Sequence, residues 1–234
     1  SPAGAGGPVS TPPGSSPDSS VPGPIGPHPT TGPEATGPGE TDAFAAETYF
    51  ADLYSADPER HEAALELAAP GSPAEAYTIF QQQFGLALSG ADITPLPQQV
   101  SETADGLQVC NDTGDCQLLG DIEMTDGLIA NFTVGGNRID ERLAVPGDPL
   151  QFGAVTVELL VAYQTVSGGN LSVFLEITST EGERFDFTTA TFTAADGRVY
   201  LVSPSQSVDI GTEWIKGPTL IYLDFDGAAT TGEL

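Results

Sequence analysis

Two cysteines are the residues of this chain whose type and spacing allow the most specific chemistry. Cys110 and Cys116 are the only cysteines in the sequence, with the five residues Asn-Asp-Thr-Gly-Asp between them. Zinc-binding cysteines are usually separated by roughly two to four residues and need two further ligands. Thioredoxin-type sites have about two residues between their thiols. The spacing therefore excludes both, and leaves either a disulfide or two free thiols.

The residues around the cysteines predict a β-hairpin that a disulfide closes. The five residues between Cys110 and Cys116 are types that tolerate tight turns, and short apolar segments flank them. Cysteines that face each other across a hairpin can meet disulfide geometry. So small a ring restricts the unfolded chain by only about 2 kcal/mol. We therefore expect a disulfide-closed hairpin and an oxidising compartment. The alternative is two free thiols in a reducing compartment.

Other side chains offer little that indicates catalysis. His61 is the one histidine besides His28, and its charged neighbours between 57 and 62 predict a solvated helix face. The chain has no Gly-x-Ser-x-Gly, no phosphate-binding loop and no dinucleotide fingerprint. The sequence Asp224-Phe-Asp226-Gly227 brings two carboxylates together but lacks a calcium-binding loop. We therefore predict a protein that is not an enzyme, with no catalytic residue, no cofactor and no metal ligand.

The charge balance excludes nucleic acid as a partner. The chain has 33 acidic and 6 basic residues, for a net charge of −27, and the basic residues are scattered. Binding to nucleic-acid phosphates or to anionic membrane surfaces depends on clustered Lys and Arg. No apolar run approaches the roughly 20 residues of a transmembrane helix. We therefore expect no transmembrane segment.

The first part of the chain, residues 1–41, predicts a disordered spacer. Half of the first 40 residues are Pro or Gly, and none is aromatic. Such a segment buries too little surface to offset its ordering entropy, and its prolines keep it extended. The chain also begins with Ser rather than Met, which favours export after removal of an upstream signal, with or without an N-terminal lipid anchor. A boundary chosen inside a longer protein is the alternative.

Residues 42–145 have the pattern of three helices followed by antiparallel strands. Apolar residues recur at steps of three and four over 42–56, over the short segment after Asp57-Pro58, and over 73–89. Ser72-Pro73-Ala74-Glu75 is a helix-start signature. Asp126-Gly127 predicts a tight hairpin within a strand meander. A last strand is expected over 139–145.

Some of the helical side chains are candidates for lining a ligand pocket. Gln83 lies on an apolar stripe between Phe80 and Phe84, where a buried amide must find a partner or face a wet cavity. A Gln at the sheet boundary that backbone groups satisfy is the alternative. The candidate pocket residues are Tyr49, Asp52, Tyr54 and Gln83.

Residues 152–227 have strand patterns throughout and follow a predicted linker, 146–151. Turn signals at 167–170, 181–183 and 196–197 separate the predicted strands. Short strands at this spacing are typical of a β-sandwich. Trp214, near Lys216, is a candidate anchor for a partner; a Trp that caps the sandwich core is the alternative. Residues 228–234 are expected to form a C-terminal tail.

Two families resemble these two regions. The three helices, the cysteine-tied hairpin and the sequence Asp126-Gly-Leu-Ile-x-x-Phe-x-Val-x-Gly136 resemble the NTF2-like cone fold of secreted or lipid-anchored actinobacterial proteins. In that family a curved sheet surrounds a long helix and leaves a conical cavity, which some members use as an active site. The segments 192–200 and 217–226 resemble the Ig-like domain of bacterial secreted lipoproteins. This second region departs from that family, because it is short and Thr178-Ser179-Thr180 replaces the asparagine that usually follows the second core strand.

The resemblances imply an α+β protein: an NTF2-like cone, with three helices on a curved antiparallel sheet, followed by an all-β Ig-like sandwich. We expect an acidic, exported protein, extracellular or anchored at the cell surface, that binds a protein or another envelope component. The alternative is a small-molecule site in the cone, with or without catalysis. An open cone would favour that alternative, and a cone filled by Tyr49, Phe80 and Phe84 would disfavour it.

Overall fold

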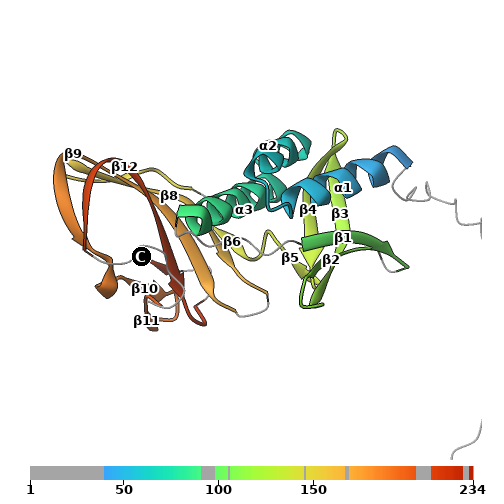
Figure 1. The fold of residues 1–234 in the computed structure, drawn as a ribbon. Coiled ribbons are helices and arrows are strands. Elements are labelled where there is room, and N and C mark those ends of the chain that lie inside the picture. The colour runs from blue at the N-terminus through green and yellow to red at the C-terminus, as the bar shows by residue number, and fades with distance from the viewer. Residues whose placement is uncertain are drawn as a thin grey trace, which may run out of the picture. The chain divides into compact units, whose positions relative to one another are not determined.

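The computed structural model describes residues 40–90, 98–104, 106–144, 146–166, 169–203, 212–228 and 232–233. These residues belong to one compact unit, Pro38–Leu234. The unit combines helices with antiparallel sheets, as predicted (Figure 1). The predicted spacer lies outside the described residues, apart from the start of the first helix.

Three helices open the described chain. Their starts follow local capping chemistry. The Asp57 carboxylate accepts a hydrogen bond from the Glu59 N–H at 3.0 Å, and Ser72 Oγ accepts one from the Glu75 N–H at 3.2 Å. The Glu75 carboxylate in turn accepts from the Gly71 N–H at 2.6 Å. The predicted helices are confirmed as α1 (Glu40–Leu53), α2 (Pro58–Leu67) and α3 (Pro73–Gly90).

A first sheet is an antiparallel meander. Cys110 and Cys116 are partners in its β2–β3 register, with Cα atoms 4.0 Å apart, and they form the predicted disulfide. Asp126 and Gly127 have φ angles of 53° and 81°, which confirms the predicted tight hairpin between β3 and β4. The strands, in spatial order, are β1 (Gln98–Thr103), β2 (Gly106–Asn111), β3 (Cys116–Thr125), β4 (Leu128–Val134) and β5 (Asn137–Arg138).

The single strand predicted over 139–145 is wrong. The chain leaves the first sheet after β5, and Ile139 is fully buried in the core beside the helices. Strand β6 (Leu143–Ala144) instead pairs with β8 (Val155–Gln164) of a second sheet. Arg142 fixes this crossing, because its guanidinium donates to the carbonyl oxygens of Gln164 and Thr165, each at 3.3 Å.

The second sheet has the order β12-β9-β8-β6, and a smaller sheet has the order β11-β10-β13. Strand β7 also pairs with β8, so the predicted linker ends inside a strand. Strand β13 pairs with β10, so the predicted tail contributes an edge. The remaining elements are β7 (Leu150–Phe152), β9 (Leu171–Asp186), a 3-10 turn (Phe187–Thr189), β10 (Thr191–Ala194), β11 (Val199–Leu201), β12 (Thr212–Phe225) and β13 (Gly232–Glu233).

The turn predicted at 181–183 is wrong. Strand β9 runs through this segment without reversing. Gly182 has a φ of 82°, and the register with β12 shifts between Ile215 and Gly217. Gly182 therefore lies in a bulge rather than in a hairpin turn. At this point β9 has more residues than the facing part of β12, and both strands continue past it.

The second sheet is buried on both faces. Alternate residues of β8, β9 and β12 enter two different hydrophobic cores. Tyr163, Phe174 and Tyr222 pack in the first core with the helices and the first sheet. Their strand neighbours Ala162, Val173, Leu175, Ile221 and Leu223 pack in the second core with the small sheet.

The contact between α3 and the second sheet is aromatic. The ring of Phe80 lies 5.0 Å from that of Tyr163 and 5.7 Å from that of Phe174, centroid to centroid. Phe80 is also stacked with Tyr77 and Phe84 of its own helix. Side chains from both sides of the predicted linker thus share the first core. The division of the chain into two domains at 146–151 stays a prediction.

We expect Phe80→Ala to lower the free energy of unfolding by about 3–5 kcal/mol, because it empties a site that touches four aromatic rings. Phe44→Ala is the matched control, since Phe44 is 71% exposed and its loss should change stability by no more than about 0.5 kcal/mol. Urea denaturation measures both. Equal effects of the two substitutions would contradict the importance of this contact.

Candidate functional site

A cleft of about 800 Å³ lies where α3 meets the disulfide-closed hairpin and the strands of the second sheet. Its lining divides into an aromatic wall, a buried carboxyl group and a polar rim. The aromatic wall comes from the helical region and from β8 and β12, and consists of Tyr54, Tyr77, Phe80, Phe84, Tyr163 and Tyr222.

The helix and the strands set the geometry of the aromatic wall. Phe80 and Phe84 are four residues apart on α3, so they lie on one face of the helix, with centroids 6.1 Å apart and ring planes within 14° of parallel. Tyr222 meets Phe84 nearly at a right angle, 81°, with centroids 5.9 Å apart. Tyr77 and Tyr163 form a second perpendicular pair at 4.9 Å. Aromatic side chains of α3, β8 and β12 therefore meet at the cleft.

Hydrogen bonds hold the tyrosine hydroxyls of the wall in place. The hydroxyl groups of Tyr54 and Tyr77 share a hydrogen bond at 3.3 Å. Gln81 Nε2 donates to the Tyr77 hydroxyl at 2.9 Å. Burial raises the pKa of both tyrosines well above the ordinary value. These hydroxyls are therefore neutral, oriented groups at physiological pH.

Asp224 is the buried carboxyl group of the cleft. It is 2% exposed, and its Oδ2 accepts hydrogen bonds from Ser172 Oγ at 2.9 Å and from the Tyr222 hydroxyl at 3.1 Å. Burial raises the pKa of Asp224, and these two hydroxyl donors partly oppose the rise. An acid with a perturbed pKa in a cavity is a recognised mark of a binding or catalytic site.

The disulfide-closed hairpin forms part of the polar rim. Asn111, Asp115, Cys116 and Gln117 all line the cleft. Asn111 Oδ1 accepts from the backbone N–H groups of Thr113 at 3.1 Å and Asp115 at 2.9 Å, which closes the turn. The Cys110–Cys116 disulfide and this side-chain cap therefore fix the rim locally.

Of the four predicted pocket residues, only Tyr54 lines the cleft. Tyr49 is fully buried, and its hydroxyl donates to the Ala74 carbonyl at 3.1 Å. Asp52 forms an ion pair with Arg60. Gln83 is half-buried and lies outside the cleft lining. Tyr49 and Phe80 instead fill the first core, with Phe84 packed against it, which disfavours a ligand site inside a cone. The cleft beside α3 is a different space, and the roles predicted for Tyr49, Asp52 and Gln83 find no common site in it.

The sequence did not predict Tyr222 as a cleft residue, and it indicated Asp224 only as one of two neighbouring carboxylates without a calcium-binding loop. Both lie on β12 two residues apart, so they project from the same face of the strand. The signal was present, because a Tyr and an Asp alternate with the apolar residues Ile221, Leu223 and Phe225. This alternation did not predict a buried site, because a strand with one polar face is normally half-exposed, whereas this face packs on α3.

His61 is a correction to the sequence analysis. It is 5% exposed, so the predicted solvated face is wrong. Its Nε2 lies 3.0 Å from the Ser55 carbonyl oxygen. A Cβ atom at Gly85 of α3 would lie 3.5 Å from the His61 ring, an ordinary van der Waals distance, so the imidazole packs against α3 at this glycine. Burial lowers the pKa of His61.

Trp214 is 68% exposed on β12 and therefore does not cap the second core. Its indole ring lies over Gly182, where an added Cβ would meet the indole nitrogen at 3.0 Å. The bulge in β9 thus supports one side of the ring and leaves the other in solvent. Its role as an anchor for a partner stays a prediction.

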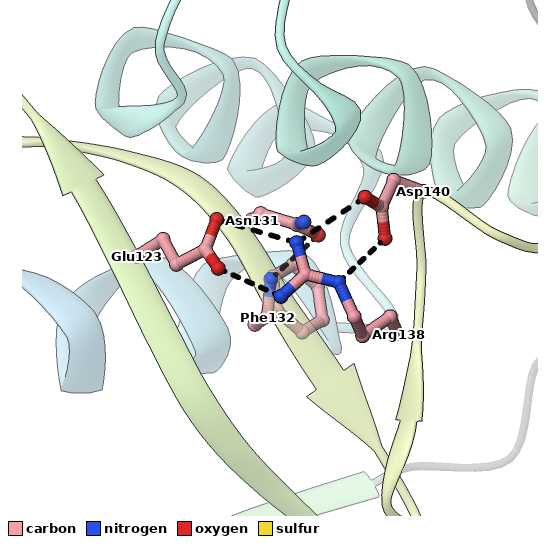
Figure 2. A network of polar contacts seen from close by, with 5 residues as sticks. All are labelled: Glu123, Asn131, Phe132, Arg138 and Asp140. Atoms are coloured by element: carbon pink, nitrogen blue, oxygen red, sulfur yellow. Dashed lines mark hydrogen bonds and ion pairs between the residues drawn. The ribbon is translucent and has the colours of Figure 1, made fainter.

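A network of charges around Arg138 lies on the first sheet. Figure 2 shows the Arg138 guanidinium between the carboxylates of Glu123 and Asp140, which it binds at 2.7 Å and 3.1 Å. Hydrogen bonds from the guanidinium lower the pKa of both carboxyl groups. All three side chains are more than one-third exposed, so the stabilisation is small. The network joins Arg138 of β5 and the following Asp140 to Glu123 of β3. The register between β3 and β4 is irregular next to Glu123.

The described residues include neither a cluster of metal ligands nor a candidate membrane-spanning helix. Within these residues, no three side chains of His, Cys, Asp or Glu gather as metal ligands would. None of the described helices combines the length and the apolar character of a membrane span.

Comparisons with known proteins give no match to the chain. No protein-family model, no curated protein and no solved structure matches it. The NTF2-like and Ig-like resemblances therefore stay predictions, and the function must be argued from the cleft itself.

We expect Asp224→Asn to raise the melting temperature at pH 7 by a few degrees. The pKa of Asp224 is raised in the folded protein, so its stabilising contribution is complete only below the unfolded pKa and is lost as pH rises through the folded pKa. Asn keeps the hydrogen-bond acceptor without the buried charge. The advantage of the variant should therefore shrink as pH falls toward about 4.

Asp148→Asn is the matched control, because Asp148 is exposed and lies outside the cleft lining. Its melting temperature should follow that of the unaltered protein at each pH. Thermal unfolding by circular dichroism measures all three proteins. A loss of stability in Asp224→Asn that is equal at pH 7 and pH 4 would contradict the assignment of a buried, destabilising charge.

Proposed function

We propose that this protein binds a small organic molecule in the cleft beside α3 and is not an enzyme. The observation that carries the proposal is the combination of a cavity of about 800 Å³ with an aromatic wall and one buried carboxyl group. Ligand pockets typically measure about 300–1,000 Å³ and are mostly apolar, with a few polar groups that fix orientation. The cleft has a volume in this range, and its lining combines aromatic rings with polar side chains.

The polar groups of the cleft support binding rather than proton transfer. The pKa values of Tyr54, Tyr77 and Tyr222 are raised by burial, so these hydroxyls hold their protons. Each also has a hydrogen-bond partner within the protein. A preformed set of hydroxyl and carboxyl groups can orient a ligand with little reorganisation.

The disulfide supports the second part of the proposal, which is that the protein is exported and acts at or outside the cell surface. Cys110 and Cys116 are joined in the hairpin, and disulfides persist mainly in oxidising compartments.

Three helices followed by an antiparallel meander support an NTF2-like reading of the first half. Two packed antiparallel sheets support an Ig-like reading of the second half.

Filling the cleft tests the binding proposal. Gln117 lines the cleft, whereas its neighbour Leu118 is 40% exposed and lies outside the lining. Adjacent strand residues point to opposite faces, so Gln117→Trp places an indole in the cleft and Leu118→Trp places the same group outside it. We expect saturable binding of 2-phenylethanol with a Kd of about 1 mM, weakened at least about tenfold by Gln117→Trp alone.

Chemical-shift titration by nuclear magnetic resonance measures this affinity and also reports whether each variant is folded. Perturbed resonances should map to α3, β8 and β12. The proposal fails if the unaltered protein shows no saturable shifts with this probe, or if both tryptophan variants weaken binding equally.

Exposed apolar side chains favour a second function, which is binding to a protein or envelope partner. Trp214, Phe152 and Leu201 are 68%, 65% and 69% exposed. Large aromatic residues on a surface are frequent anchors of protein interfaces. This function does not exclude ligand binding, because these residues lie outside the cleft lining.

The single tryptophan of the chain makes the second function measurable. Trp214 fluorescence should be strongly quenched by acrylamide in the isolated protein, because the ring is mostly exposed. Addition of purified envelope proteins from the host should reduce quenching at least about twofold if the ring enters an interface that excludes water. Unchanged quenching with every envelope fraction would count against Trp214 as the anchor.

A further inference from the structure

We infer that the cleft selects an organic cation, that is, a molecule with a protonated amine or a quaternary ammonium group next to an aromatic or other apolar body. This inference rests on the proposed function, because it names the class of molecule that the cleft binds. It depends on the charges, the ring arrangement and the position of Asp224 within the cleft.

The charges of the cleft have one sign. Its described lining includes the carboxyl groups of Asp115 and Asp224 and no Lys or Arg. Arg142 is not in the described lining, and its guanidinium binds other groups: it donates to Asn137 Oδ1 at 3.0 Å and to two backbone carbonyls. The chain as a whole carries a net charge of −27. Such a field attracts cations and repels anions from the cleft.

The position of Asp224 gives the cation a specific counter-charge. The carboxyl group is 2% exposed and sits next to Tyr222, a ring of the aromatic wall. An interaction between opposite charges is much stronger in such a site than in water. The hydroxyl groups of Ser172 and Tyr222 bind one carboxyl oxygen, Oδ2, and so hold the group in a fixed orientation.

The aromatic wall favours the same class of ligand. The faces of Phe and Tyr rings carry partial negative charge and attract ammonium groups within about 6 Å. Phe80 and Phe84 are nearly parallel, while Tyr222 stands at 81° to Phe84, so rings approach the cleft in two orientations. Combinations of perpendicular rings with an acid are the recognition chemistry of quaternary ammonium groups.

A neutral aromatic ligand would use only part of this site. It would gain contact with the rings but no attraction from the carboxyl groups of the lining. An aromatic anion would meet two carboxyl groups and no base. The order of affinity expected from the structure is therefore cation, then neutral molecule, then anion.

Three aromatic probes of nearly equal size test this order: 2-phenylethylamine, 2-phenylethanol and phenylacetate, which at pH 7 are a cation, a neutral molecule and an anion. We expect the amine to bind at least about tenfold more tightly than the alcohol, as a charged hydrogen bond allows. Phenylacetate should show no saturable binding. Titrations by nuclear magnetic resonance at fixed ionic strength measure the three affinities.

A carboxyl-to-amide variant tests the counter-charge. Asp224→Asn should bring the affinity for the amine to within about twofold of the affinity of the same variant for the alcohol. Asp148→Asn removes the same charge from an exposed position outside the cleft lining, and should leave all three affinities unchanged. Equal losses in both variants would mean that the general acidity of the protein, not Asp224, attracts the amine.

The failures of the two proposals are distinguishable. If neither the amine nor the alcohol binds saturably, the proposed function itself fails. If the alcohol binds as tightly as the amine, ligand binding stands and the selection of cations is overturned. This comparison uses the unaltered protein, so it does not depend on the folding of any variant.

Discussion

The burial of the second sheet on both faces is the constraint on which the rest of the structure depends. Tyr163, Phe174 and Tyr222 fill the core next to α3, and the residues between them fill the core next to the small sheet. A shift of one residue in any of these strands would exchange the two sets of side chains. The pairing of β8, β9 and β12 is therefore specified twice, once by each core.

The cleft is a consequence of this arrangement. Its aromatic wall combines Phe80 and Phe84 of α3 with Tyr163 of β8 and Tyr222 of β12, so neither the helical half nor the strand-rich half contains the site alone. Asp224 is brought to the cleft by the same strand period that directs Tyr222 toward α3. The hairpin closed by Cys110 and Cys116 adds a rim that the disulfide holds locally. The cleft thus lies where α3, the second sheet and this hairpin meet.

The features that the sequence predicted correctly are local ones. The helix starts at Pro58 and Pro73, the disulfide-closed hairpin and the Asp126-Gly127 turn each depend on residues a few positions apart. The turn predicted at 181–183 failed because Gly182 allows a bulge as readily as a reversal, and only the partner strand β12 decides between them. The cleft was missed for the same reason. Tyr54, Tyr77 and Tyr222 are distant in sequence, and one packing contact brings them together.

The small sheet leaves a consequence for the protein at high concentration. Strand β11 is an edge of the described sheet, and it presents Val199 and Leu201, which are 62% and 69% exposed. An apolar edge with unpaired backbone groups is a template on which another copy can add a strand. The net charge of −27 opposes such an encounter through repulsion between copies. Acid or concentrated salt weakens that repulsion. The resistance of the protein to aggregation therefore depends on its net charge.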